Sequence, residues 1–103
     1  MPTYGFAVLT LMALLPAIAA AAEDTSAGRD LAERLCSRCH SISHTGKSPD
    51  PKAPAFRTLK ELYPVEDLEE SLAEGLSTGH PDMPEVQLPP DVIASFIAYL
   101  KTL

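Results

Sequence analysis

Two cysteines and a histidine stand close together near residue 40, and their spacing is the clearest chemical signal in the sequence. Cys36 and Cys39 are separated by two residues, and His40 follows directly. In a helix, residues three apart lie on the same face, so both thiols can reach one planar ligand while the next residue lies over it. This C-x-x-C-H spacing is typical of covalent haem attachment. We expect one haem c, held through thioethers to Cys36 and Cys39, with its iron bound to His40.

Three other interpretations of the cysteine pair explain less of the sequence. A thioredoxin-like redox pair sits between a strand and a helix, and no β-rich segment precedes Cys36. A zinc site needs two further soft ligands, and the remaining histidines, His44 and His80, lack the paired spacing of such a site. The third interpretation, two buried cysteines beside an unrelated histidine, gives no reason for the export-type leader described below.

A methionine is the natural candidate for the sixth position of the iron. Met83 is the one methionine after residue 22, and it lies in the loop sequence GHPDMP at 79–84. Prolines flank the loop methionine, which suits a held ligand better than a gap-filling core residue. A His/Met pair raises the reduction potential. We expect His40 and Met83 as axial ligands, with His80 as the rival sixth ligand and His44 as a solvated loop residue.

The amino-terminal residues are typical of an export signal. The chain from Phe6 to Ala22 carries no charge and closes on an alanine-rich run. We expect a signal peptide at 1–22, a folded domain at 23–103 and a location in the periplasm. The usual positive charge before the apolar run is missing, so a retained leader that anchors the chain to the membrane, facing the periplasm, is the alternative.

Composition narrows the functional classes. The chain has 103 residues, with 14 acidic against 8 basic side chains and a formal net charge of −6, which argues against nucleic acid and anionic lipid as partners. The domain after residue 22 is small and contains no tryptophan. Domains of this size often need a disulfide, metal or cofactor to complete the core. Two cysteines exclude a scaffold of several disulfides.

The elements that must position these residues follow from the apolar spacing. Helical patterns alternate with proline-rich loops, and no alternating run predicts a sheet. In the first helix Leu31 and Leu35, four residues apart, should share one face. Pro64 suits the first position of a later helix, and Gly75 suits its stop. We expect an all-α fold with helices at 26–36, 56–63, 64–74 and from 91 to the C-terminus, and irregular loops at 41–55 and 77–90.

Taken together, these motifs resemble those of a small class I cytochrome c of the bacterial periplasmic type. They stand in the order of that family, and the resemblance covers essentially the whole chain after residue 22. It implies three to five short helices wrapped around one covalently attached haem, with the N- and C-terminal helices crossing. The matching features are Gly28, the attachment motif at 36–40, Ala53-Pro54, Met83-Pro84 and the segment 96–101.

The resemblance also implies roles for particular residues. Gly28 and Tyr99 would carry the close contact where the two helices cross. A proline carbonyl would accept the second imidazole N–H of His40, with Pro54 as the counterpart and Pro51 as its competitor.

The family's propionate-binding tryptophan has no equivalent, so Arg57 or Tyr63 would contact the haem propionates.

In function, the resemblance implies a one-electron carrier rather than an enzyme. It would be a monomer that meets redox protein partners in transient, electrostatically steered complexes. The alternatives are a haem-based small-molecule sensor and a cytochrome subunit of a larger dehydrogenase complex. Acidic residues cluster at 66–74, and seven of the eight basic residues precede position 61. We expect a dipolar protein that is more positive on the C-x-x-C side, although a solvated acidic helix face explains the cluster equally well.

Overall fold

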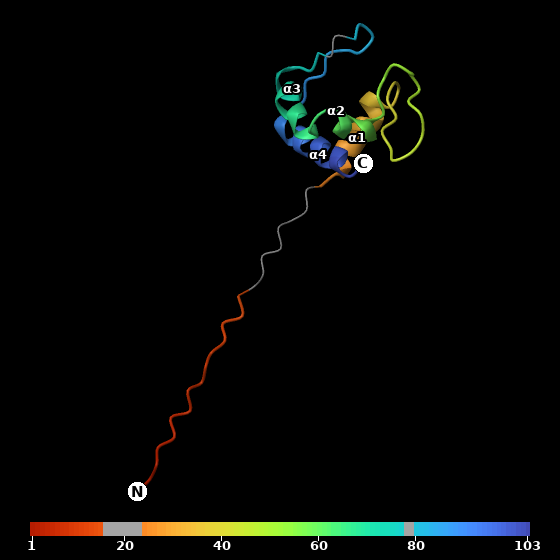
Figure 1. The fold of residues 1–103 in the computed structure, drawn as a ribbon. Coiled ribbons are helices and arrows are strands. Elements are labelled where there is room, and N and C mark those ends of the chain that lie inside the picture. The colour runs from red at the N-terminus through yellow and green to blue at the C-terminus, as the bar shows by residue number, and fades with distance from the viewer. Residues whose placement is uncertain (16–23, 78–79) are drawn as a thin grey trace.

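The computed structural model describes residues 1–15, 24–77 and 80–103. Within these ranges the fold is all-α, as the sequence predicts, and strands are absent apart from a single bridge between two residues. It has four α-helices connected by loops, and shorter helical turns adjoin α1, α2 and α3 (Figure 1). The helices are α1 (Ser26–Leu31), α2 (Leu59–Leu62), α3 (Leu68–Glu74) and α4 (Pro90–Lys101), with a π-helical segment at Ala32–Cys36 and 3-10 turns at Phe56–Thr58 and Val65–Asp67.

The first and last helices pack against each other, which confirms the expected contact between them. Gly28 makes the approach close, because a Cβ atom at this position would lie 2.6 Å from the Cα of Phe96 and closer still to the backbone of Ser95. The Gly28 N–H donates to the Ser95 hydroxyl at 2.8 Å, and that hydroxyl donates to the Asp24 carbonyl at 2.6 Å. The first N–H groups of a helix have no partner within it. Ser95 therefore caps α1 from α4.

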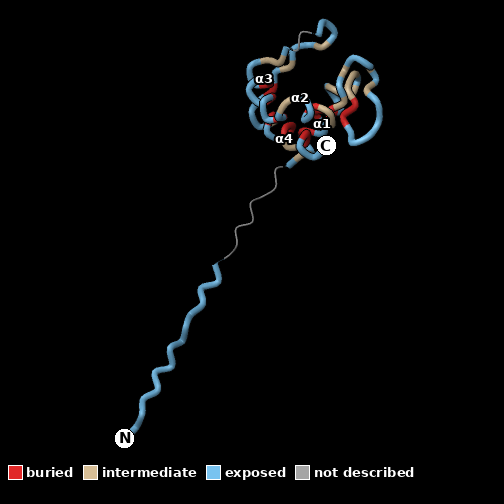
Figure 2. Tube along the Cα trace, in the orientation of Figure 1, coloured by how far each residue is buried: buried red, intermediate tan, exposed pale blue. Residues whose placement is uncertain are grey.

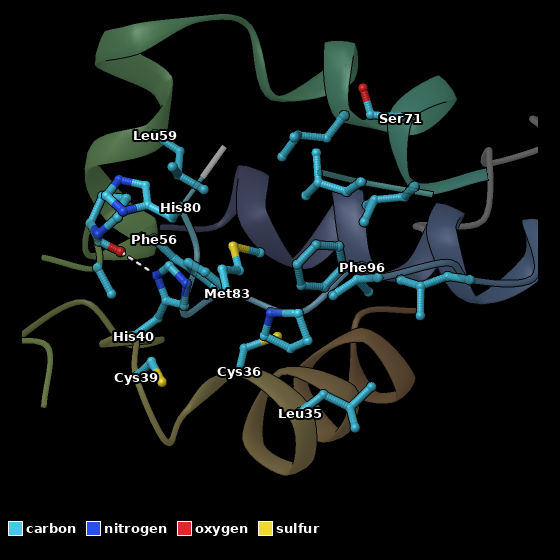
Figure 3. A pocket seen from close by; sticks show the side chains of 18 of the residues that line it. Leu35, Cys36, Cys39, His40, Phe56, Leu59, Ser71, His80, Met83 and Phe96 are labelled. Atoms are coloured by element: carbon cyan, nitrogen blue, oxygen red, sulfur yellow. Dashed lines mark hydrogen bonds between the residues drawn. The ribbon is translucent and has the colours of Figure 1, made fainter. Parts of the chain in front are cut away.

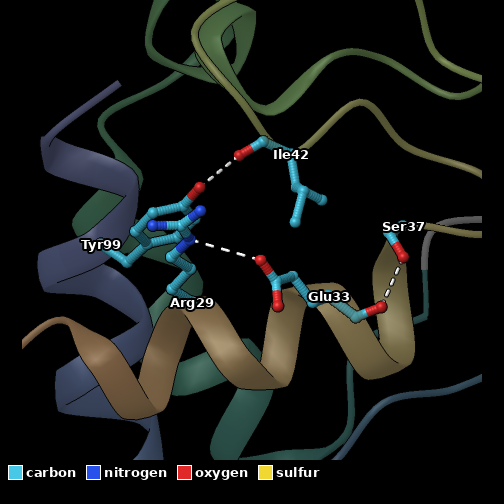
Figure 4. Close-up of polar contacts among 5 residues, drawn as sticks. All are labelled: Arg29, Glu33, Ser37, Ile42 and Tyr99. Carbon is cyan, nitrogen blue, oxygen red and sulfur yellow. Dashed lines mark hydrogen bonds and ion pairs between the residues drawn. The ribbon is translucent and has the colours of Figure 1, made fainter.

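The aromatic residue expected at this crossing has a different role. The atoms nearest to Gly28 belong to Ser95 and Phe96, not to Tyr99. The Tyr99 hydroxyl instead donates to the Ile42 carbonyl at 2.5 Å in a buried position (Figure 4). This bond ties α4 to the chain just after the C-x-x-C-H motif.

The first helix does not stay α-helical up to the motif. After α1 the chain continues as the π-helical segment, and the Ser37 N–H donates to the Ala32 carbonyl, five residues back, at 2.9 Å. The Ser37 hydroxyl donates to the Glu33 carbonyl, which satisfies another acceptor at the helix end (Figure 4). Leu31 and Leu35, which were expected on one face, both line the cavity described below, but Leu31 is 6% exposed and Leu35 is 59% exposed. The wider turn changes which side chains face the core.

In the middle of the chain, prolines and a glycine lie where regular structure is interrupted. Residues 41–55 form no regular element, as the prolines predict. Pro64 is extended, with ψ 130°, and precedes a 3-10 turn instead of occupying the first helical position. Helix α3 ends at Gly75, whose φ is +112°. An ion pair of 3.0 Å joins Glu66, ahead of α3, to Lys101 at the end of α4.

The core lies between α1, α3 and α4 and is built mostly from aliphatic side chains, with three aromatic ones among them (Figure 2). Ala32 is fully buried, and three further residues are 2% exposed: Leu72, Ile93 and Leu100. Phe56 and Phe96 meet edge to face with ring centroids 5.9 Å apart.

The predicted leader is separate from this core. Residues 1–15 are exposed and form no helix (Figure 2). The end of the predicted signal peptide, including the junction after Ala22, lies outside the described residues. Among the described residues, none of the helices combines the length and apolar character that crossing a membrane requires.

Candidate functional site

One cavity of about 530 Å³ opens between the end of the π-helical segment, α2, α3 and the loop that follows α3 (Figure 3). Its volume falls in the range of roughly 300–1,000 Å³ that small-molecule and cofactor pockets occupy. Its wall is mostly apolar, with contributions from Leu31, Phe56, Leu59, Leu68, Leu72, Val86, Leu88 and Phe96. The cavity also collects both cysteines, His40, His80 and Met83.

His40 is held in one orientation by its neighbours. Its Nδ1 lies 2.7 Å from the carbonyl oxygen of Pro54. A carbonyl can only accept, so Nδ1 carries the proton and the lone pair of Nε2 is available to a metal. The His40 ring also lies against Phe56, with centroids 4.9 Å apart. The proline that contacts the histidine is therefore Pro54, and the competing Pro51 does not take this place.

The two cysteines reach the same cavity from a turn. Both are free, partly buried thiols. The helix ends at Cys36, but the N–H groups of Cys39 and His40 both donate to the Cys36 carbonyl, at 3.2 and 2.9 Å. This compact turn places residues 36, 39 and 40 in the cavity wall. Burial raises the pKa of the Cys36 thiol to about 11, so it is uncharged at neutral pH.

Met83 approaches the cavity from the loop between α3 and α4. It is partly buried, and its N–H donates to the His80 carbonyl at 3.2 Å in a tight turn. Figure 3 shows its sulfur directed into the cavity, beyond the His40 ring. His80 also lines the cavity, whereas His44 is exposed and lies outside its wall. The structure thus brings both candidate sixth ligands to the cavity that holds His40; Gly79 of the same loop lies outside the described residues.

The two residues suggested for propionate contacts differ in position. Tyr63 lines the cavity, and burial raises the pKa of its hydroxyl. Arg57 is not part of the wall; its guanidinium donates to the Ser41 hydroxyl at 3.2 Å. The sequence analysis missed the other polar residues of the wall, for which no spacing pattern gave a signal: Asp50, Lys52, Asp67, Ser71 and Asp82.

The cavity mouth carries the exposed apolar side chains of the folded domain. Leu35 is 59% exposed and Leu62 is 66% exposed, and both line the cavity. In residues 24–77 and 80–103 no other large apolar side chain is as exposed. Because both side chains line the cavity and also reach solvent, they form part of its rim.

The residues around the cavity fit a covalently attached haem. Two free thiols stand three residues apart, an imidazole nitrogen is free to bind a metal, and a thioether points into the same apolar space. Imidazole and thioether are the ligands that raise the potential of haem iron. Among the described residues, no group of three or more His, Cys, Asp and Glu side chains is arranged to hold a bare metal ion.

Comparison with protein-family models, with curated proteins and with solved structures gives no match for this chain.

Proposed function

We propose that this protein is a periplasmic one-electron carrier that holds a single haem c through Cys36 and Cys39, with His40 and Met83 as axial ligands of the iron. The observation that carries the proposal is the convergence of these four side chains on one apolar cavity, with the His40 imidazole fixed by Pro54. The fold proposed is that of a class I cytochrome c, in which α1 and α4 cross and the helices wrap around the haem.

Each residue has a defined task in this proposal. When bound, haem supplies an iron centre that takes up and releases one electron. Cys36 and Cys39 fix the position of the group covalently. The Pro54 carbonyl orients His40 and raises its basicity as a ligand. Met83 supplies a soft thioether, and it closes the sixth position to small molecules. The apolar wall excludes water.

The apolar mouth suits electron transfer to a protein partner. Exposed Leu35 and Leu62 are part of the cavity rim, through which an electron would pass. A small apolar contact surface supports weak, rapidly exchanging complexes. Charged residues outside this mouth would steer the encounter, and that steering is screened by salt.

Intact mass and the absorption spectrum of the exported protein test the proposal together. The expected mass is that of a chain starting after Ala22 plus one haem, and a chain that keeps residues 1–22 would instead support the membrane-anchored alternative. The expected spectrum is that of a six-coordinate haem c with the weak charge-transfer absorption of a thioether on ferric iron. A protein exported without covalent haem would refute the proposal.

Two substitutions identify the sixth ligand. Met83→Ala should keep haem attached but remove the thioether absorption and lower the potential by on the order of 100 mV. His80→Ala is the matched control in the same loop and should leave the thioether absorption and the reduction potential unchanged. If the two outcomes were reversed, His80 would be the ligand.

Carbon monoxide separates the carrier from a sensor. The reduced wild-type protein should bind it poorly because Met83 occupies the iron, and rapid stoichiometric binding would favour a small-molecule sensor. Purification in a stable complex with a dehydrogenase would favour the subunit interpretation.

A further inference from the structure

The loop that carries Met83 is closed at its base by a short backbone bridge. The Leu76 N–H donates to the Val86 carbonyl at 2.7 Å, and the Val86 N–H donates back to the Leu76 carbonyl at 3.2 Å. Nine residues, 77–85, lie between these two positions. Figure 1 shows the chain leaving the end of α3 and, from residue 80 on, returning toward α4. The bridge therefore sets where the loop begins and ends.

Two more hydrogen bonds attach the returning chain to α3. The Leu88 N–H donates to the Leu72 carbonyl at 2.9 Å, and the Gln87 side-chain amide donates to the Ala73 carbonyl at 3.1 Å. Carbonyls in the last turn of a helix have no partner within the helix, so these bonds satisfy acceptors that would otherwise need water. We call the Leu76–Val86 bridge and these two bonds the loop clamp.

The chain enters the loop clamp through Gly75, which no other residue type could replace without strain. Its φ is +112° and its ψ is 105°, a conformation that residues with a Cβ atom rarely adopt. An added Cβ atom would meet only the far end of the exposed Glu85 side chain, 3.2 Å from its carboxyl carbon and closer to one oxygen. That side chain can move aside, so the strain comes from the backbone conformation.

The loop clamp belongs to the cavity wall as well as to the loop. Leu76, Val86 and Leu88 all line the cavity that Met83 enters. A displacement at the base of the loop would therefore move both the wall and the methionine. It would not move His40, whose contacts come from Cys36, Pro54 and Phe56.

We propose that Gly75 is a positioning residue for the sixth ligand of the iron. Its backbone conformation allows the loop clamp to close, and the closed clamp holds Met83 against the iron. This inference rests on the proposed function, since it needs haem in the cavity. It concerns the strength of the Met83 bond and not the attachment of the haem.

The test measures how readily added imidazole displaces Met83 from the ferric holoprotein. In Gly75→Ala we expect imidazole to bind at least about tenfold more tightly than in the wild type. The thioether absorption should weaken in parallel, and the haem content per chain should stay unchanged. The clamp variant Gln87→Ala removes one exposed side-chain bond and should tighten imidazole binding by about threefold.

Gly46→Ala is the matched control. Gly46 also has a positive φ, +93°, but the nearest atom to an added Cβ is the Ser41 hydroxyl oxygen at 4.0 Å. The substitution Gly46→Ala therefore imposes backbone strain outside the Met83 loop, and its imidazole affinity should equal that of the wild type. An equal rise in affinity in Gly46→Ala would show that general destabilisation is responsible, and it would overturn the inference.

The outcomes separate this inference from the function it rests on. A wild-type protein without covalent haem, or without the thioether absorption, would refute the proposed function or its sixth ligand. A normal wild-type spectrum together with unchanged imidazole affinity in Gly75→Ala and Gln87→Ala would refute the positioning role alone. If Gly75→Ala does not accumulate, Gln87→Ala against Gly46→Ala decides the question by itself.

Discussion

The two sides of the cavity are built in different ways. On one side, His40 and both cysteines lie at the end of the first helical segment, whose α1 part packs against α4, and the carbonyls of Pro54 and Cys36 accept the hydrogen bonds that fix the turn. On the other side, Met83 lies in the loop between α3 and α4, which the loop clamp closes at its base. The first side is ordered by the core of the domain, and the second by the loop clamp and, in our proposal, by the backbone conformation of Gly75. Changes on the first should affect assembly and stability, and changes on the second should affect ligand exchange.

The largest expected effect is on the side ordered by the core. His40→Ala should lower the yield of haem-loaded, exported protein by at least about tenfold, because ligand binding and folding are coupled. Met83→Ala, on the loop side, should keep the yield within about twofold, since the thioethers and His40 remain. The amount of haem per polypeptide in the periplasmic fraction measures the yield of haem-loaded protein in each variant. Equal losses in the two variants would remove the distinction between the sides.

Gly28→Ala tests whether the packing of α1 on α4 supports the attachment side. The added Cβ would collide with the backbone of Ser95 and Phe96. We expect the free energy of unfolding to fall by about 2 kcal/mol, as for other overpacked sites. Denaturant unfolding of the holoprotein measures it.

In Gly28→Ala, the sign of the change in the free energy of unfolding is informative, because helix propensity alone would raise it. Alanine favours a helix over glycine by about 1 kcal/mol, so Gly28→Ala would stabilise the protein if α4 were not in contact. Ala27→Gly, at the exposed neighbouring position, reports the propensity effect alone.

A smaller effect is expected from Tyr99→Phe. This change removes the buried hydrogen bond to the Ile42 carbonyl and should lower the free energy of unfolding by about 1 kcal/mol. Imidazole affinity should not change, because the bond lies on the attachment side. A change in imidazole affinity with no loss of stability would mean that the two sides are coupled through α4.

The smallest effect is expected at the exposed ion pair between Glu66 and Lys101. The pKa of Glu66 is lowered, first by a hydrogen bond from its own backbone and then by the hydrogen bond from Lys101. The pair therefore stabilises the fold above the usual glutamate pKa, and this contribution is lost as pH falls through the lowered value. Lys101→Ala should raise the Glu66 pKa only part of the way, as measured by NMR titration. A full return to the usual value would assign the whole shift to Lys101.

The residues with a chemical signature could be predicted from the sequence. The motif at 36–40, Pro54 and Met83 were each singled out by residue type, spacing or a resemblance, and the structure gathers them at one cavity. The all-α class and the irregular loop at 41–55 also follow from apolar spacing and prolines. These features are encoded locally, so a single sequence is enough.

The residues that hold the site together could not be predicted in the same way. Ser95 caps α1 from 67 positions away along the chain, and Tyr99 bonds to Ile42 across 57. The Leu76–Val86 bridge joins two apolar residues, and neither lies in an alternating run that would predict a strand. Each of these contacts depends on how the helices pack, and nothing in the local sequence distinguishes the residues involved.

The π-helical segment at Ala32–Cys36 bears on how this chain tolerates changes in length. In a regular α-helix, Cys36 would be turned about 140° from Leu31, five residues earlier. Hydrogen bonds that span five residues bring the two closer to one face, and both line the cavity. If one residue between Leu31 and Cys36 were deleted, the two would be four residues apart. In an ordinary α-helix, residues at that interval lie on nearly the same face. We therefore expect the chain to absorb the loss of exposed Arg34 as a return to regular helix, with Cys36 still facing the cavity in which we propose the haem.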